Sequence, residues 1–352
     1  MPNIDSERLT RIAHDILIKH GANEEEASTV AQYLTTANLA GHDSHGILQL
    51  LGYVDRIKLG HIVPGAKFEI EKETPTTAVI NGHWGFGMVV QTKATRLAIE
   101  KAKKSMVAAV TVAFQSHVGL LGTYTLMAAS EGMIGMMFCD SGRGPKQVVP
   151  FGGRDARLGT NPICIALPSN LDAPIYTDAA TSQVAAGKVA LYRSRQKSVP
   201  SGWLVDKEGN PSTNPDDYFA GGALMPMGGN DSGHKGYGLG CMVDVFAGIL
   251  TGLGWGEDPQ ARHNDGSLFI AINASAFRPI ESFKDDVTGF ARYLKSSRPA
   301  EGFKEVMYPG EIESSTRKQR LQTGVPIEDA TWASVTKLAA SVGVSTGRIE
   351  KG

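Results

Sequence analysis

The chain has 352 residues, of which 41% are hydrophobic and 20% charged, and its formal net charge is −1. These values exclude a disordered or fibrous protein, and the balanced charge without a basic block argues against a nucleic-acid partner. No stretch of about 20 residues is apolar enough to span a membrane, and the first residues lack the basic-then-apolar order of a signal peptide. Three widely spaced cysteines predict reduced thiols in the cytoplasm, rather than disulfides or a cysteine zinc site.

Two helices are predicted within the first 40 residues, because apolar residues recur at helical spacing from Leu9 to Leu17 and from Ala27 to Ala37. Asn23 and Glu26 form a capping-box pattern before the second helix. From residue 76 onward, short apolar runs alternate with helical patterns. The predicted strands are residues 76–80, 107–114, 134–139, 163–167, 174–177 and 269–272, with helices at 91–104, 123–130 and 237–250 and a hairpin within 203–215. This order predicts a central α/β sheet and a helical module built from both chain ends.

The glycine pattern argues against the standard dinucleotide-binding turn. Glycine makes up 41 of the 352 residues, about 12% against roughly 7% in typical proteins. The segments Gly85–Gly87 and Gly236–Gly240 each lack the third glycine of a G-x-G-x-x-G turn, and no phosphate-binding P-loop sequence is present. A standard Rossmann domain is therefore not expected.

Two segments carry histidines that could do chemistry. His42 and His45, within Gly41–Gly46, are three residues apart and could bind a metal, act in catalysis or cap the preceding helix. His117 directly follows the predicted strand 107–114, and catalytic groups are often held on a loop just past a strand end. Its ordinary pKa near 6.5 suits proton transfer at neutral pH, although a purely structural loop histidine would show the same pattern.

Three further segments are weaker signals. Asp178 follows a predicted strand and could accept a hydrogen bond from a ribose hydroxyl or simply form a turn. The segment Gly228–Gly236 runs into the predicted helix at 237–250, where free N–H groups and Lys235 could seat a phosphate. Tyr308–Glu311 is a turn by composition.

Taken in order, six short motifs resemble one family. The sequence is similar to the malate/L-lactate dehydrogenases of the type that includes the sulfolactate and ureidoglycolate dehydrogenases. The match extends from the N-terminal helices to about residue 345. The motifs are Asp43–Gly46, Ser116-His117 with Gly119, Gly159–Pro162, Asp178–Ser182 with Gly187-Lys188, Gly233–Gly236 and Pro309–Glu311.

The resemblance implies a non-Rossmann α/β/α sandwich with a mixed sheet, similar to L-sulfolactate dehydrogenase, joined to a helical domain from both chain ends. We expect residues 1–72 and 283–352 to form the helical domain and residues 73–282 to form the NAD(P)-binding α/β domain. The family relationship further implies a homodimer with the active site near the subunit interface.

The resemblance also implies roles for individual residues. His117 is the expected acid/base, and His45 is a second active-site histidine that also contacts the cofactor. The residues expected to contact the substrate are Ser44, Gln49, Tyr53 and Arg143. The other residues expected to line NAD or NADP are Gly119, Leu120, Leu121, Thr160, Asn161, Asp178, Ala179, Ala180, Thr181, His234, Lys235, Pro309, Gly310 and Glu311. No metal is expected.

The implied reaction is reversible hydride transfer between NAD(P)H and a 2-oxo acid. Reduction of a carbonyl creates an alkoxide, so a protonated imidazole must lie within hydrogen-bond reach to neutralise it. In the oxidative direction, neutral His117 would remove the hydroxyl proton. Asp140, just past the strand 134–139, is a candidate to orient the ring.

One departure from the family pattern concerns the substrate carboxylate. Many members have an arginine three residues after the glycine of the Ser-His-Gly motif, and this chain has Gln49 there. Glutamine cannot form a bidentate charged pair with a carboxylate. The sequence therefore looks closer to the hydroxycarboxylate dehydrogenase branch, which reduces varied 2-oxo acids. Arg143 or Lys146 could replace the missing charge.

Alternative functions remain open at this point. The same fold could reduce a cyclic imine carboxylate. A metal-dependent hydrolase would use His42, Asp43 and His45, and a binding protein would hold NADH without turnover. A preference for NADP would need an added cation near the ribose. The candidates for that cation are Arg193, Arg195 and Lys197.

Overall fold

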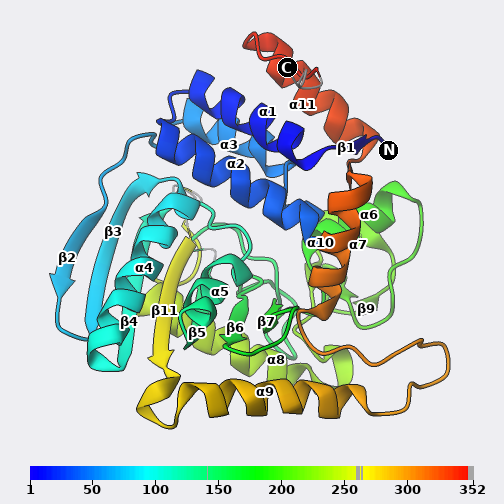
Figure 1. Cartoon of the computed structure of the whole chain (residues 1–352). Coiled ribbons are helices and arrows are strands. Elements are labelled where there is room, and N and C mark those ends of the chain that lie inside the picture. Colours follow the sequence, from blue (N-terminus) through cyan, green and yellow to red (C-terminus); the bar gives the residue numbers. More distant parts are fainter. Residues whose placement is uncertain (141, 259–261, 263–264, 348–352) are drawn as a thin grey trace.

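The computed structural model describes residues 1–140, 142–258, 262 and 265–347, and a seven-stranded mixed sheet forms its centre (Figure 1). The strand order is β2-β3-β4-β11-β5-β6-β7. These strands are β2 (Glu69–Glu73), β3 (Thr77–Gly85), β4 (Val107–Gln115), β5 (Met133–Asp140), β6 (Ile163–Leu167), β7 (Ile175–Ala179) and β11 (Asp265–Asn273). β3 is parallel to β4, whereas β11 lies antiparallel between β4 and β5.

Helices cover both faces of the sheet. On one face, α5 (Gly122–Ser130) packs so closely that a Cβ on Gly135 would lie 2.6 Å from the Thr125 carbonyl oxygen. A Cβ on Gly266 would instead meet the carbonyl oxygen of Ala247, in the π-helix η2 (Asp244–Ile249). Gly135 pairs with Ala271, five residues from Gly266 on the same strand, so the two contacts lie on opposite faces. The expected α/β/α sandwich is confirmed.

Most predicted elements are present. The helix at 91–104 is α4 (Gly87–Ser105), which lies on the same face as α5 (Figure 1). The predicted hairpin is formed by the antiparallel pair β8 (Leu204–Val205) and β9 (Pro211–Ser212). The remaining elements include β10 (Ala223–Leu224), beside β8, and the helices α6 (Ala186–Ser194) and α7 (Pro215–Phe219).

One predicted boundary is wrong. The helix expected at 237–250 begins eight residues earlier, as α8 (Gly229–Val243), and continues into η2. Because Gly236 has no apolar side chain, the pattern of apolar residues does not show where this helix begins. The same glycine lets the helix pack closely against the backbone of Met227. A Cβ on Gly236 would lie 2.4 Å from the carbonyl oxygen of Met227. The first two turns of α8 are therefore helix rather than the predicted phosphate-binding loop.

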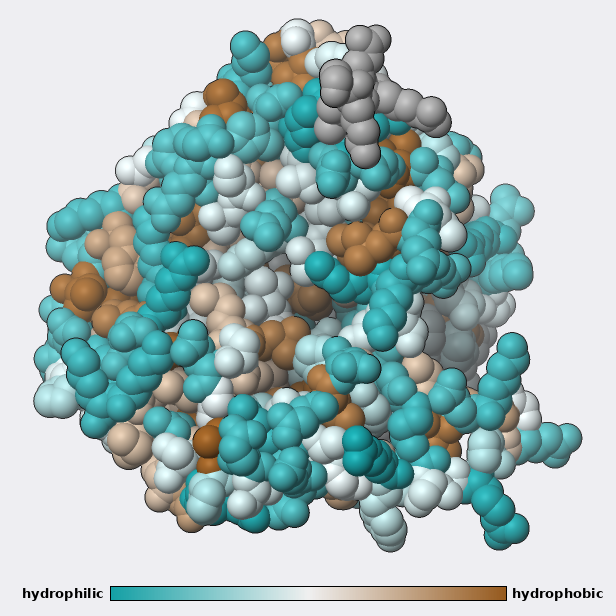
Figure 2. Space-filling view, viewed as in Figure 1, coloured by the Kyte–Doolittle hydropathy of each residue, from teal (hydrophilic) through white to brown (hydrophobic). Residues whose placement is uncertain are grey.

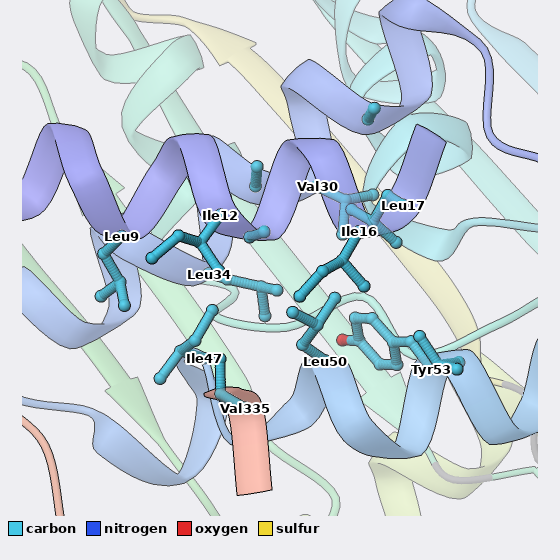
Figure 3. Close-up of a cluster of buried hydrophobic side chains, with 14 of the residues drawn as sticks. Leu9, Ile12, Ile16, Leu17, Val30, Leu34, Ile47, Leu50, Tyr53 and Val335 are labelled. Carbon is cyan, nitrogen blue, oxygen red and sulfur yellow. The ribbon is translucent and has the colours of Figure 1, made fainter. Parts of the chain in front are cut away.

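The helical module is built from both chain ends. It contains α1 (Ser6–Lys19), α2 (Glu24–Leu39), α3 (Gln49–Lys58) and α11 (Asp329–Ser341), while β1 (Asn3–Ile4) pairs with β12 (Val325–Pro326). The predicted capping box at the start of α2 is formed. The buried core of this module (Figure 3) includes Leu9, Ile12, Ile16, Leu17, Val30, Leu34, Ile47, Leu50, Tyr53 and Val335.

The helix α9 (Ile280–Lys295) belongs with the sheet. Its Val287 and Ala291 share a buried cluster with Ile175 of β7 and with Tyr308. In Figure 1 this helix runs along the far end of the sheet from α1 and α2. The expected boundary at residue 283 falls inside α9 and assigns most of this helix to the helical domain. We propose instead that the second part of that domain begins with α10 (Glu311–Thr323).

Candidate active site

The sheet brings the polar motifs to one edge, which is formed by the ends of its strands and not by an outer strand. β4, β5 and β7 all end at this edge, and β6 and β11 begin there. The loops that carry His117 and Asn161, and the end of β7 that carries Asp178, therefore lie on the same side of the sheet. Polar groups on loops held by a rigid sheet are well placed to bind a ligand.

The two histidines expected in the site lie together. The rings of His45 and His117 are stacked, with centroids 5.7 Å apart and an interplanar angle of 25°. His45 comes from the short 3-10 helix η1 (Asp43–His45), and His117 comes from the loop after β4. The hydroxyl of Tyr53, on α3, lies 2.7 Å from Nδ1 of His117. Two neighbouring elements, η1 and α3, thus meet the distant loop after β4 at the His117 ring.

His45 is a neutral ring at neutral pH. Burial and, to a smaller extent, the positive charge of nearby His42 lower its pKa to about 4. Its Nδ1 lies 3.1 Å from Oγ of Ser44. His45 can therefore stack and form hydrogen bonds in the site, but it is not a proton donor near pH 7.

The segment that carries His45 is held by α10. Arg320 donates two hydrogen bonds to the carboxylate of Asp43, with N–O distances of 2.6 and 3.0 Å. Nε2 of His42 lies 3.5 Å from Oε1 of Glu313, and this contact lowers the pKa of the Glu313 carboxyl. His42 and Asp43 are therefore engaged by the C-terminal part of the chain, while Ser44 and His45 face the site.

The expected substrate residues have protein partners in this structure. The side-chain amide of Gln49 donates to the backbone carbonyl of Ser44 at 2.7 Å, so it braces the η1 turn. Arg143 forms an ion pair with Asp258 at 3.4 Å. Ser44 is exposed, and a Cβ on Gly187, in the first turn of α6, would lie 3.5 Å from its Cβ. The start of α6 thus borders the site beside Ser44.

Three of the expected cofactor segments converge on Tyr176, a residue that the sequence analysis missed. The carboxylate of Asp178 accepts from the backbone N–H of Gly122 at 2.8 Å, which ties β7 to the loop Gly119–Leu121. The Tyr176 ring leaves no room for a side chain on Gly122, and its N–H donates to the carbonyl of Pro309 at 3.2 Å. Its place two residues before Asp178 in a predicted strand was the available signal. Figure 2 shows that the face of the molecule turned toward the viewer is hollowed near its middle.

The segments around Thr160 and Thr181 form a buried junction. The hydroxyl of Thr181 donates to the carbonyl of Asn161 at 3.0 Å, and its N–H donates to the carbonyl of Thr160 at 2.9 Å. The Asn161 amide nitrogen donates to the carbonyl of Gly240 in α8 at 2.9 Å. Asn161 is fully buried, and its Oδ1 has no hydrogen-bond partner in the part of the protein that the structure describes. Such an atom fits a site completed by a bound ligand.

His234 and Lys235 lie in the second turn of α8, not on an open loop. The His234 ring packs edge-on against Phe151, with centroids 5.6 Å apart. At the start of the helix, the N–H of Gly228 already donates to the side chain of Gln183 at 2.7 Å. The prediction of a phosphate seat formed by free N–H groups beside Lys235 is therefore corrected: these residues present a helix face.

Two buried aspartates lie where β5 ends and β11 begins. Asp140, the expected orienting group, accepts hydrogen bonds from two glycine amides, whereas the group at Nδ1 of His117 is the Tyr53 hydroxyl. Asp265 accepts from the N–H of Val118 at 2.9 Å, next to His117 in sequence. Burial raises the pKa of Asp265 to about 7. Sequence analysis missed Asp265 because only the register of β11 brings it to this loop.

The metal-dependent hydrolase considered for His42, Asp43 and His45 would need a set of metal ligands. In the part of the chain that the structure describes, no group of three or more His, Cys, Asp and Glu side chains is placed to hold a metal ion. None of the helices in that part is long and apolar enough to cross a bilayer. Arg193, a candidate ribose-phosphate cation, forms an ion pair with Asp216 at 2.6 Å.

Replacing Arg320 with alanine should loosen the η1 turn. The change removes both hydrogen bonds to Asp43, and we expect the free energy of unfolding to fall by about 1 kcal/mol, since the pair is partly exposed. Amide hydrogen exchange of residues 42–46, measured by mass spectrometry, should become faster. Arg317→Ala, on an exposed position of the same helix, is the matched control. Unchanged exchange in Arg320→Ala would show that the turn does not depend on this pair.

Replacing Asp265 with asparagine should change how stability depends on pH. The folded pKa near 7 lies above the ordinary value of 3.8, so between these values the native state holds the proton more tightly than the unfolded chain. Wild-type stability should therefore fall as pH rises from 4 to 7. The amide introduced by Asp265→Asn does not titrate. The free energy of unfolding of this variant, relative to that of wild type, should therefore rise by about 1 kcal/mol or more between pH 4 and pH 7.

Urea unfolding at several pH values measures this difference. Asp231→Asn, which alters an exposed carboxylate on α8, is the control and should show no such trend. A stability difference between Asp265→Asn and wild type that stays constant with pH would contradict the buried, protonated state of Asp265.

Comparison with known proteins agrees with this geometry. The family model for malate/L-lactate dehydrogenase matches residues 4–336. A malate dehydrogenase of Pyrococcus horikoshii is 38% identical over 348 residues, which cover 97% of this chain and 96% of the relative. A ureidoglycolate dehydrogenase (NAD(+)) of Escherichia coli K12 is 35% identical over 333 residues, which cover 93% of each chain.

Solved structures show the same fold. The sulfolactate dehydrogenase of Methanocaldococcus jannaschii superposes with a TM-score of 0.88 at 35% identity and covers 98% of both chains. Other similar proteins are named hydroxycarboxylate dehydrogenase B, from Escherichia coli O157:H7, and delta1-piperideine-2-carboxylate reductase, from Pseudomonas syringae. The match over nearly the whole length shows that this chain belongs to the malate/L-lactate dehydrogenase family.

Proposed function

We propose that this protein is an NAD(P)-dependent 2-hydroxyacid dehydrogenase that reversibly reduces a 2-oxo acid. The observation that carries the proposal is the stacked pair of His45 and His117, placed at the sheet edge where the expected cofactor segments converge. Its relatives are named dehydrogenases of hydroxy acids, and one name specifies NAD(+). Family membership and site geometry therefore support the same oxidoreductase chemistry.

His117 is the proposed acid/base of the reaction. Its Nδ1 faces the Tyr53 hydroxyl, so Nε2 is the nitrogen that we assign to the substrate. NAD(P), when bound, supplies or accepts the hydride. In reduction, protonated His117 gives a proton to the forming alkoxide, and in oxidation the neutral ring takes the hydroxyl proton. His45 stays uncharged, which leaves the proton on His117 in the reducing direction.

The proposed cofactor site uses the segments Gly119–Leu121, Asp178–Thr181 and Pro309–Glu311. Gly310 has φ +94°, and a Cβ there would lie 2.4 Å from the Pro174 carbonyl oxygen, so the backbone of this turn packs against the start of β7. Glu311 is fixed by Lys295 at 2.5 Å. The buried Oδ1 of Asn161 is a further atom that a ligand could satisfy. His45, Thr160, His234 and Lys235 remain proposed cofactor residues.

The proposed substrate site contains Ser44, Gln49 and Arg143, whereas Tyr53, also expected there, lies at Nδ1 of His117. Gln49 carries no charge, so the substrate carboxylate needs another cation. Arg143 and Lys146 lie on the loop after β5, which leaves the same sheet edge as His117, and Nζ of Lys146 donates to the Gly142 carbonyl at 2.6 Å. We infer that this loop supplies the charge and that the enzyme accepts varied 2-oxo acids.

A second candidate reaction uses the same site. One structural neighbour is named a delta1-piperideine-2-carboxylate reductase, and reduction of a cyclic imine also needs a hydride and a placed proton donor. Parallel assays of 2-oxo acids and cyclic imine carboxylates, each with NADH and NADPH, separate the two reactions and determine the cofactor preference.

The proposed assembly is a cytoplasmic homodimer. Support comes from an exposed apolar row on α8 and the residues after it, which would be costly to leave in water. The row consists of Leu239, Met242, Val245, Ile249 and Leu250, which are 39–59% exposed.

Removing the cations of the loop after β5 should weaken substrate binding. In the double variant Arg143→Ala/Lys146→Ala, loss of a charge-assisted contact should raise KM for 2-oxo acids about tenfold or more, with a smaller change in kcat. Arg157→Ala, on an exposed position, is the control. An unaltered KM in the double variant would assign the carboxylate to another group.

Replacing His117 with alanine should abolish proton transfer and spare cofactor binding. We expect kcat to fall about 100-fold or more, because general acid–base catalysis contributes roughly that factor. The Kd for NADH, from fluorescence titration, should change less than about threefold. His61→Ala, in the loop after α3, is the control. Turnover like that of wild type in His117→Ala would remove this residue from the mechanism.

A further inference from the structure

We propose that Tyr53 is a positioning residue, whose buried hydroxyl accepts the Nδ1 proton of His117 and so directs Nε2 to proton exchange with the substrate. The inference rests on the proposed function. It replaces direct substrate contact as the role of Tyr53, and it assigns a task to a buried group that the reaction otherwise leaves unused.

Tyr53 is almost completely buried. The residue is 2% exposed, and its ring lies in the core of the helical module with Leu50 and Ile16 (Figure 3). A side chain enclosed in this way has almost no surface to offer a substrate. Its hydroxyl instead lies 2.7 Å from Nδ1 of His117, and the two rings are 6.0 Å apart at 55°.

The position of Tyr53 on α3 links it to the segment that carries His45. Gln49 and Tyr53 are four residues apart, so they share one face of the helix. Gln49 donates to the carbonyl of Ser44 and so braces the turn that carries His45, while Tyr53 meets His117. One helix face therefore holds both histidine-bearing segments, and it sets the distance between the two stacked rings.

The proton balance of the reaction determines which atom donates in the hydrogen bond between His117 Nδ1 and Tyr53 Oη. In oxidation, Nε2 takes the substrate hydroxyl proton as hydride leaves for the nicotinamide, so Nε2 must start without a proton. The neutral ring must then carry its proton on Nδ1 and donate it to Tyr53 Oη. In reduction the imidazolium loses the Nε2 proton, and the Nδ1–H to Oη bond is unchanged. Both directions thus need the same tautomer.

The surroundings keep Tyr53 a neutral acceptor. Burial raises the pKa of its phenol well above the ordinary value, and the charge of Asp265 on β11 acts in the same direction, opposed by Arg56 on α3. His45, from η1, stacks on the His117 ring. A hydroxyl that does not ionise can hold His117 in both of its protonation states.

Replacing Tyr53 with phenylalanine removes only the oxygen and tests the proposal. We expect kcat to fall about tenfold in both directions, the usual size of a lost hydrogen bond, with KM for substrate and cofactor changed less than about threefold. The pH at which kcat is half maximal should shift. Tyr33→Phe, which removes a hydroxyl bonded to Thr92 on α4, is the matched control.

Nitrogen-15 NMR of protein with labelled imidazole nitrogens identifies the tautomer of His117 and does not depend on catalytic turnover. The His117 signal, assigned by its loss in His117→Gln, should report a protonated Nδ1 at high pH in wild type and a mixture of tautomers in Tyr53→Phe. A protonated Nε2 in wild type would overturn the proposal even if the variant did not fold. So would an unchanged kcat, or a raised KM at constant kcat, which would place Tyr53 on the substrate.

These outcomes are distinct from failure of the proposed function. If wild type turned over no 2-oxo acid, hydroxy acid or cyclic imine with either cofactor, the reaction assignment would fall. The NMR result would still decide whether Tyr53 fixes the His117 ring.

Discussion

The insertion of β11 between β4 and β5 is the constraint on which the site depends. β11 is antiparallel to both neighbours, so the carboxyl ends of β4 and β5 come to the same edge as its own start. His117, Asp140 and Asp265 reach this edge only through that register. The close approach of η2 to Gly266 and of α5 to Gly135 then locks the strands from both faces. The chemistry of the loops is thus set by backbone pairing in the sheet.

The histidine pair adds a second layer of control, because its two members belong to different parts of the fold. His117 is attached to the sheet, whereas His45 sits on a turn held by α3 and α10. Any shift of the helical module against the sheet would change the stacking of the rings. The contact between Tyr53 and His117 crosses the same boundary, so the proposed acid/base is held by the helical module as well as by the sheet.

Much of this organisation could be predicted from the sequence, and the failures have physical causes. Apolar runs located the strands well, because buried strands need continuous hydrophobic residues. The start of α8 was missed because Gly229–Gly236 has no apolar stripe, and the helix is stabilised there by close backbone packing. The helix α3 was also missed, since it is short and follows a polar turn.

The site was only partly predictable for a related reason. The family motifs pointed to His45, His117 and Asp178 as candidates, because each lies in a short motif that can be read locally in the sequence. Asp265 and Tyr176 matter through pairings with residues more than fifty positions away, and no local pattern encodes these. The partner of His117 is of the same kind: Tyr53 is 64 positions away in the chain and looks like an ordinary core residue.

The clamp from Arg320 to Asp43 joins residues 277 positions apart, and the neighbouring core needs α11 as well. During synthesis, the nascent N-terminal helices leave the ribosome long before these partners exist. Residues 4–89 supply most of the core around α1 and α2, and its remaining members, Val325, Ile327, Val335, Ala339 and Val344, are added only when the chain end has been translated. The η1 turn gains its contacts with Arg320 only after α10 has been made, so a chain that terminates upstream of α10 lacks this clamp.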